Sequence, residues 1–407
     1  MMDSTFELMV MLSGLYSMKR LFVLVSLLNL SLLFSGCFWD KDSTESLKKP
    51  IIVKIGQVSP LTGGVAHLGK DCEDGVALAV HELNQQNRTL NGRKLKFELV
   101  SLNDMDDPRQ ATEAAQRIVD SGAVSIIGHL NSGATLPASS IYARHNITQI
   151  TVSSNIRYTR QGFKTAFRIM AADYQQGKAV SSFAVKDLHL KRIVVIDDQT
   201  AYGQGLADVF VKIAKESSPK GAVLSRYYVD SYTTDFGALL AKIKLLHPDA
   251  VFFGGTNAQS TPLLRQMRQL GLSIPFITGD MSCMDSFIEQ VKKVAAPFYC
   301  STNGYDLSKL PGAAGFIKRF KSFTGHEPFL YSPYTYDATM LVADAIRSLQ
   351  TLNSEKIAAY LHDKKRKPYH GVTGDIYFDS DGNRENVGVS IYTLCGSKIC
   401  LRSTVFS

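Results

Sequence analysis

The chain has 407 residues, of which 45% are hydrophobic and 20% are charged. This length exceeds what one hydrophobic core usually supports and predicts two domains, while the composition excludes a disordered chain and a polytopic membrane protein. The formal net charge is +8, but Lys and Arg are interspersed with acidic residues along most of the chain. That pattern is typical of a solvated surface and does not indicate a nucleic-acid partner.

An export signal lies near the start of the chain. A short basic region at 18–20 precedes the apolar run LFVLVSLLNLSLLF at 21–34, which is too short for a confident membrane-spanning helix. We therefore expect a signal peptide at 1–36, with Met18 as an alternative start.

The signal ends in LFSGC, whose last residue is Cys37. This stretch resembles the bacterial lipobox, in which the cysteine becomes the lipid-modified first residue of the mature protein. The resemblance implies a lipid on Cys37, a polar tether at 37–50, and a protein anchored to a membrane in the periplasm or cell envelope. The alternative is an ordinary signal peptide followed by an incidental cysteine.

Export places the other cysteines in an oxidising compartment, where disulfides form. Cys395 and Cys400 bracket Gly-Ser-Lys-Ile between two strand-like segments, which predicts a disulfide across a hairpin. Cys283 with Cys300 is a further pairing that the sequence suggests but leaves open, and Cys72 is left over. The sequence has no His/Cys cluster with zinc spacing, so we expect no metal.

Apolar strands alternate with helices along most of the chain. The predicted strands lie at 54–58, 95–100, 124–127, 148–152, 192–196, 223–229, 250–253 and 275–278. The predicted helices lie at 71–86, 108–120, 137–145, 172–187, 205–216, 236–246 and 262–270. Such alternation predicts parallel sheets covered on both faces, and its restart after Arg168 predicts two doubly wound α/β lobes.

In sheets of this kind, ligands bind outside the carboxyl ends of the strands. Six predicted strand ends are rich in Gly, Ser, Thr, Asn and Asp: 59–64, 128–133, 153–155, 197–203, 254–257 and 279–282. One such residue is enough to cap a helix, whereas several together can line a cleft. The stretch IIGHLNSGATLPASS at 126–140 therefore predicts an anion site at a helix N-terminus. The alternative is that Asn131 or Ser132 only caps that helix.

Six stretches, in order, resemble the leucine/isoleucine/valine-binding proteins of bacterial ABC importers. They are VKIGQVSPLTGGVAHLGKDCEDGVALAVHELN, NDMDDPRQATEAAQRIVD, IIGHLNSGATLPAS, DDQTAYGQGLAD, FFGGTNAQSTPLLRQMRQLG and GVTGDIYFDSDGNR, and the resemblance spans residues 51–395. It implies a type I periplasmic binding protein fold, in which two Rossmann-like lobes are joined by three crossovers around a ligand cleft. Lobe one would comprise 51–172 and 303–378, and lobe two 173–302 and 379–407.

The resemblance also implies a site for an amino acid. Ser132 stands at the family's hydroxyl position for the ligand α-carboxylate, Ser153 supplies backbone contacts, and Asn155 replaces a ligand-contacting threonine. On the opposite lobe, Tyr202 matches a ligand-contacting tyrosine, and Asp280 stands where an acidic residue binds the α-ammonium. The alternatives are that Tyr202 is only a packed aromatic and that Asp280 only caps a helix.

Several positions depart from the leucine binders. Leu68 and Thr256 replace aromatic residues that line the ligand pocket, and Asp280 is one methylene shorter than the usual Glu. Asp106 and Asn131 occupy the places of two cysteines that form a disulfide in well-known members. Leucine selectivity therefore does not follow, and a larger, polar or aromatic side chain, or a small amide, is an alternative ligand.

Four further polar residues near these stretches have structural interpretations. We expect Asp173 and Gln176, in ADYQQG, to cap and orient the first helix of lobe two. For His67 and His129 we expect structural or solvated roles, because neither has a partner at metal-ligand spacing.

The sequence does not support an enzyme. The segment at 203–208 is an incomplete dinucleotide fingerprint, and GxSxG, Walker and HExxH motifs are absent from the sequence. We expect a monomeric, non-catalytic binding protein without a cofactor, which delivers a branched-chain or related amino acid to the permease of an ABC importer. The alternative is a sensory module that reports its ligand state to a signalling partner.

Overall fold

A computed structural model describes residues 49–218, 221–283, 287–289, 297–396 and 398–406. The predicted signal peptide, the predicted lipidation site Cys37 and nearly all of the predicted tether lie outside these residues. Within the described part of the chain, no helix combines the length and the apolar character needed to cross a membrane.

The first sheet has six strands in the order β2-β3-β1-β4-β5-β6. They are β1 (Ile51–Ser59), β2 (Thr89–Leu90), β3 (Arg93–Asn103), β4 (Ser125–Gly128), β5 (Thr148–Thr151) and β6 (Ala166–Arg168). All neighbours pair in parallel except β2, which pairs antiparallel with β3 at one edge. Because all the parallel strands point the same way, their carboxyl ends lie together at one end of the sheet, across the direction of the strands.

Helices cover both faces of this sheet, as its continuous apolar strands require. They are α3 (Ala66–Gln85), α4 (Pro108–Asp120) and α5 (Ser132–Arg144). Val53 and Ile55 of β1 belong to the same apolar cluster as α3. Val58 and Ile126 instead pack with α4 and α5 in a separate cluster.

The second sheet has seven strands in the order β15-β14-β11-β10-β9-β7-β8. They are β7 (Ile193–Asp197), β8 (Val223–Tyr228), β9 (Ala250–Gly254), β10 (Phe276–Thr278), β11 (Phe298–Thr302), β14 (Gly388–Cys395) and β15 (Lys398–Phe406). The first five run parallel, and the C-terminal hairpin β14–β15 adds antiparallel strands at one edge. Its helices are α6 (Asp173–Ser182), which continues as a π-helical turn to Asp187, α7 (Ala201–Ser217), α8 (Gly237–Leu245) and α9 (Asn257–Gln269).

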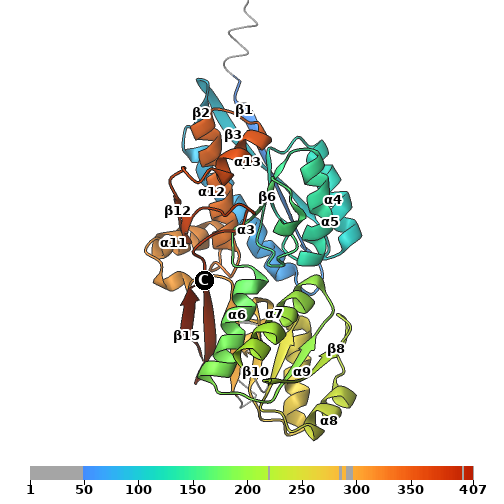
Figure 1. The fold of residues 1–407 in the computed structure, drawn as a ribbon. Coiled ribbons are helices and arrows are strands. Elements are labelled where there is room, and N and C mark those ends of the chain that lie inside the picture. Colours follow the sequence, from blue (N-terminus) through green and yellow to red (C-terminus); the bar gives the residue numbers. More distant parts are fainter. Residues whose placement is uncertain (1–48, 219–220, 284–286, 290–296, 397, 407) are drawn as a thin grey trace, which may run out of the picture. The chain divides into compact units, whose positions relative to one another are not determined.

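The chain returns to the first sheet between the last parallel strand and the C-terminal hairpin. The returning elements are α11 (Ala313–Thr324), α12 (Ser332–Leu349), α13 (Ser354–His362), β12 (Tyr369–Gly371) and β13 (Gly374–Ile376). Helix α12 packs along α3, and Figure 1 shows these late helices in orange among the blue elements of the first sheet. The sequence pattern had assigned no helix or strand to 303–378.

Two disulfides involve strands of the second sheet. Cys395 and Cys400 are joined across the β14–β15 hairpin, and Cys283 is joined to Cys300 on β11. Cys72, on α3, is a buried free thiol.

The eight predicted strands are all present, but several helices begin earlier than their sequence pattern predicts. Helices α5 and α9 begin five residues before Pro137 and Pro262, which lie inside them. Helices α3 and α7 also begin upstream, at Ala66 and Ala201. Glycine and proline lower helix propensity in these segments, and tertiary packing overrides that preference. The consequence is that helix N-termini start at the strand ends.

Helix α12 is fixed to α3 by a buried carboxylate. Asp71 is 3% exposed and accepts hydrogen bonds from the backbone amides of Phe329 (3.0 Å), Tyr331 (2.6 Å) and Ser332 (2.9 Å). Burial raises the pKa of Asp71, and these hydrogen bonds oppose that rise. A Cβ on Gly75 would lie 2.3 Å from the Ser332 carbonyl, so the two helices approach too closely for a larger residue there.

We predict that Asp71→Ala lowers the free energy of unfolding by about 2–4 kcal/mol, because buried amides would lose their acceptor. Urea denaturation would measure the change. The matched control is Glu73→Ala on the same helix, which removes a surface ion pair with Lys70 (2.6 Å). The control should cost about 0.5 kcal/mol or less, and an equal loss in both variants would contradict the anchoring role of Asp71.

Candidate functional site

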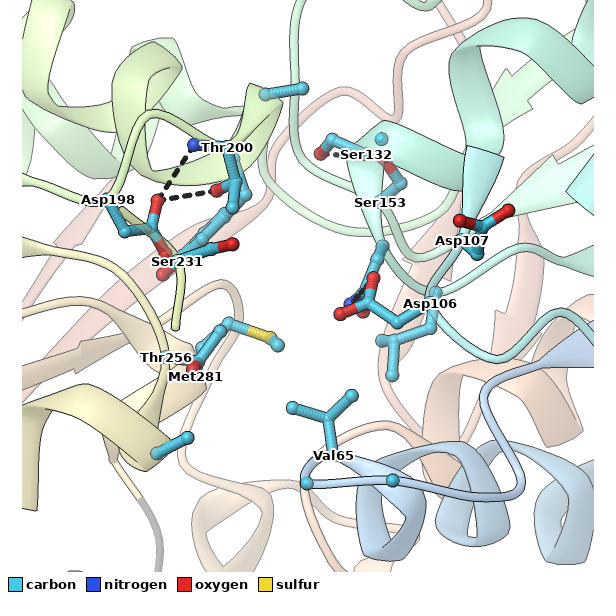
Figure 2. A pocket seen from close by; sticks show the side chains of 18 of the residues that line it. Val65, Asp106, Asp107, Ser132, Ser153, Asp198, Thr200, Ser231, Thr256 and Met281 are labelled. Carbon is cyan, nitrogen blue, oxygen red and sulfur yellow. Dashed lines mark hydrogen bonds between the residues drawn. The ribbon is translucent and has the colours of Figure 1, made fainter. Parts of the chain in front are cut away.

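A cavity of about 500 Å³ lies where the strand ends of both sheets meet. Its lining comes from the segments that follow eight parallel strands, together with Tyr331: 62–65, 105–108, 130–133, 152–154, 198–202, 231–232, 256–259 and 280–281. Figure 2 shows side chains from both lobes facing this space. The sequence had indicated six of these strand ends, and the structure adds those after β3 and β8.

One wall of the cavity carries two neighbouring hydroxyls. The Ser132 and Ser153 Oγ atoms are 3.0 Å apart, and the amide of Asn155 donates to Ser132 Oγ at 3.4 Å. Ser132 is the first residue of α5, so its hydroxyl lies at the positive end of the helix dipole. The pair can therefore donate to an anionic group without an opposing charge of its own.

The structure agrees with the capping interpretation of this stretch in position but not in hydrogen bonding. Asn131 is the N-cap of α5, but its side chain makes no capping hydrogen bond. It donates instead to the Asp106 carboxylate. The Ser132 hydroxyl faces Ser153 rather than the amides of its own helix. Both side chains are thus directed toward other groups at the cavity wall.

The opposite wall is organised around Asp280, which is 3% exposed. One carboxylate oxygen accepts hydrogen bonds from the Tyr202 hydroxyl (2.7 Å) and the Gln176 amide (3.1 Å), and the other from the Tyr331 hydroxyl (2.8 Å). Asp280 begins a short 3₁₀ turn whose N-cap is Gly279, so it is not a capping residue. Burial, and secondarily the charge of Asp280, raise the pKa of both tyrosines, which therefore stay neutral donors.

Two of these partners were not identified as site residues from the sequence. Gln176 does not cap α6 as expected, because its amide group donates to Asp280 and to the Ser301 hydroxyl (3.0 Å). The amide of Ala172 is instead bound by Gln175. Tyr331 comes from the returning part of the chain, far from any predicted strand end. It is placed by the hydrogen bond of its own amide to Asp71, and the sequence carries no local signal of that contact.

The remaining predicted residues have three different locations. Thr256 lines the cavity, as does Met281, and both are labelled in Figure 2. Leu68 is fully buried in the apolar core behind the cavity, and Val65 of the same segment reaches the lining instead. Asn155 does not line the cavity either. Its side-chain amide donates to the Ala201 carbonyl at the start of α7, and this hydrogen bond links the two lobes.

A buried polar chain supports the strand end that precedes Ser132. His129 Nδ1 lies 2.7 Å from the Asp104 carboxylate, and His129 Nε2 lies 3.0 Å from the Tyr142 hydroxyl. All three side chains are fully buried. Both ring nitrogens of His129 have partners within the protein, as buried polar groups require, so this histidine has a structural role. Across the described residues, His, Cys, Asp and Glu side chains form no group that could hold a metal ion.

Asp173, at the crossing into α6, is a buried carboxylate with few hydrogen-bond donors. It is 1% exposed, and neither oxygen has a well-formed hydrogen bond within the described structure, although the nearby Ser154 hydroxyl lowers its pKa somewhat. Burial raises its pKa to about 7, against the opposing charge of Arg168. It begins α6, where the helix dipole favours a negative charge, but it is not a side-chain cap.

The chain matches the family model described as periplasmic binding protein over residues 52–395. It is 31% identical to the Leu/Ile/Val-binding protein homolog 1 of Brucella suis biovar 1, over 84% of this chain and 90% of that protein. A leucine-, isoleucine-, valine-, threonine- and alanine-binding protein of Pseudomonas aeruginosa is 29% identical, over 84% and 89%. The crystal structure of a leucine-binding protein from Thermotoga maritima superposes with a TM-score of 0.78 and 29% identity, covering 87% of this chain and 98% of that one.

Proposed function

Because this chain belongs to the periplasmic binding protein family, we propose that it captures an amino acid outside the cytoplasm and delivers it to an ABC importer. It has the type I periplasmic binding protein fold predicted from the sequence, with two α/β lobes, and it is a binding protein rather than an enzyme. The relatives named for binding leucine, isoleucine and valine support a branched-chain or related amino acid as the ligand.

The pairing of a hydroxyl wall with an acidic wall carries this proposal. Ser132, at the start of α5, and Ser153, after β5, suit a carboxylate, and Asp280 on the facing wall suits an ammonium group. An α-amino acid carries both groups on one carbon. Two or three charge-assisted hydrogen bonds of about 1.5–3 kcal/mol each, with apolar contacts, would give about −8 kcal/mol, or micromolar affinity.

We predict that Ser132→Ala and Asp280→Asn each weaken amino-acid binding by about 30- to 1000-fold, because a desolvated ligand charge would lose its partner. Titration calorimetry measures the affinity, after thermal-shift screening of the common amino acids and small amides has identified the ligand. A ligand at a hundred times its dissociation constant should stabilise the protein by about 2.7 kcal/mol.

The matched control for this test is Ser140→Ala on the same helix. Its hydroxyl donates to the Pro137 carbonyl (2.9 Å) and does not line the cavity, so affinity should be unchanged. Normal binding by both site variants would contradict the amino-acid assignment. Normal binding by Asp280→Asn alone would indicate a ligand with an anionic group and no ammonium.

We propose that the lobes comprise 51–172 with 303–378 and 173–302 with 379–407, and that they close on the ligand about the three connections. Contacts such as Tyr331 to Asp280 would then form or tighten on closure. Small-angle scattering should give a smaller radius of gyration with the ligand than without it. An identical radius in both states would count against closure.

We also propose that the mature protein is a lipoprotein anchored through Cys37, on the basis of the LFSGC stretch that follows the basic and apolar regions. Cys37→Ser should leave the precursor uncleaved or release the protein into the soluble fraction, because the lipid acceptor is lost. Membrane fractionation and the intact mass would measure this. If the Cys37→Ser variant keeps the membrane attachment and the processed mass of the wild-type protein, the lipid anchor at Cys37 is ruled out.

A further inference from the structure

The wall assigned to the ligand carboxylate has no positively charged side chain of its own. It offers the hydroxyls of Ser132 and Ser153, and the dipole of α5 adds roughly half an elementary charge. The lining that the structure describes contains no Lys, Arg or His, whereas four aspartates contribute to it: Asp106, Asp107, Asp198 and Asp280. A space lined by carboxylates repels an anion. Positive charge close behind the wall would offset this repulsion.

Arg168, the last residue of β6, supplies a positive charge behind this wall. Its side chain is fully buried, and its guanidinium group donates hydrogen bonds to the carbonyl of Ser153 and to the carbonyl of Asn155 (2.8 Å). Ser153 lines the cavity, and the amide of Asn155 donates to the Ser132 hydroxyl. Arg157 also contacts Asn155, but Arg157 is exposed, so solvent screens its charge. The buried guanidinium is thus bonded to the residues that build the wall.

The guanidinium of Arg168 has only neutral hydrogen-bond acceptors among the described residues. Its third hydrogen bond goes to the side-chain oxygen of Asn383 (3.2 Å). Asp173 lies nearby, but neither of its oxygens accepts a hydrogen bond from the guanidinium. Burial lowers the pKa of Arg168 to about 10, against the opposing effect of the Asp173 charge, so the group stays protonated at neutral pH. A buried cation without an ion-pair partner is costly, and a ligand carboxylate at the wall would supply the missing negative charge.

The segment between β13 and β14 fixes the guanidinium in this position. The Arg168 amide donates to the Gly382 carbonyl (2.8 Å), and the Arg168 carbonyl accepts from the Arg384 amide (3.0 Å). Gly382 has a positive φ of 87°, and a Cβ there would lie 2.1 Å from the Ala166 carbonyl oxygen, so this close approach requires glycine. Asn383, between these two contacts, then binds the guanidinium. Because both the backbone and the side chain of Arg168 are held, its charge has a fixed position relative to the wall.

We propose that Arg168 is a positioning residue for the ligand carboxylate, which places a fixed positive charge behind the hydroxyls of Ser132 and Ser153. This inference rests on the proposed function, since it requires a ligand with a carboxylate at this wall. The guanidinium orders the segment that carries Ser153 and attracts the carboxylate through an interior that water screens poorly. A lysine or arginine inside the cavity would instead pair with the aspartates there, so the position behind the wall keeps the charge available to the ligand.

Titration calorimetry of the full chain with L-leucine, or with the common amino acid that binds instead, tests the charge of Arg168 through two variants. Arg168→Gln removes the charge but keeps an amide that can donate to a carbonyl, whereas Arg168→Lys keeps the charge. Arg168→Gln should weaken binding about 30-fold, the order expected for a unit charge acting through a protein interior. Arg168→Lys should recover most of that loss.

Asn383→Asp gives a second test that leaves Arg168 in place. The new carboxylate keeps the shape of the asparagine side chain and pairs with the guanidinium. Because Asn383 does not line the cavity, this variant removes no contact with the ligand. It should nonetheless weaken binding about 10-fold, since the ligand carboxylate would meet a guanidinium that is already neutralised. Thermal denaturation shows whether each variant is folded, and Asn383→Asp decides the question if Arg168→Gln is not.

The matched control is Arg384→Gln, which removes the charge of another buried arginine. The guanidinium of Arg384 donates to the Thr373 hydroxyl (2.8 Å) and to the carbonyls of Ile169 (3.3 Å) and Asp375 (3.0 Å), and none of these residues lines the cavity. This variant should lower stability and leave the affinity nearly unchanged.

Equal losses of affinity in Arg168→Gln and in either Arg168→Lys or Arg384→Gln would overturn the inference, because the effect would not depend on the charge behind the wall. Normal binding by folded Arg168→Gln or by folded Asn383→Asp would also overturn it. Each of these results leaves the proposed function standing. A wild-type protein that binds none of the common amino acids would overturn both.

Discussion

The parallel direction of the strands is the constraint on which the site depends. A parallel strand has its carboxyl end at the same end of the sheet as the carboxyl ends of its neighbours. The loops that follow these strands therefore meet, although they are far apart in the sequence and need no direct attraction to one another. Here eight such loops, four from each sheet, line one cavity. The antiparallel strands are the edge strands β2 and β15 and the strand β14 next to β15, and none of them contributes a residue to the described lining.

Buried carboxylates then give the site its detailed geometry. Asp71 holds the amide of Tyr331 at the start of α12, and the hydroxyl of the same tyrosine reaches Asp280 from the first lobe. Gln176 and Tyr202 reach Asp280 from α6 and α7 of the second. A buried carboxylate is tolerated only where several donors converge on it. Asp280 therefore orders side chains from three helices, and its position depends on both lobes.

The chain as a whole and the cavity differ in the sign of their charge. Lys and Arg outnumber Asp and Glu by 45 to 37 in the whole chain, yet the described cavity lining is acidic. Asp107 is satisfied by capping and Asp280 by three side-chain donors, whereas one oxygen of Asp198 is left without a donor in the described structure.

The sequence by itself determined eight of the strands, the doubly wound fold class and six of the eight strand ends that line the cavity. Local apolar periodicity and Gly-rich strand ends are properties of short segments, so they can be read without the fold. Only the tertiary structure decided where the helices begin and which partners surround Asp280. It also decided that Leu68 is buried in the core while Val65 lines the cavity. Helix N-termini start at the strand ends because packing there outweighs the low helix propensity of Gly and Pro. Tyr331 reaches Asp280 through a hydrogen bond to Asp71, a contact between residues 260 positions apart that no local pattern encodes.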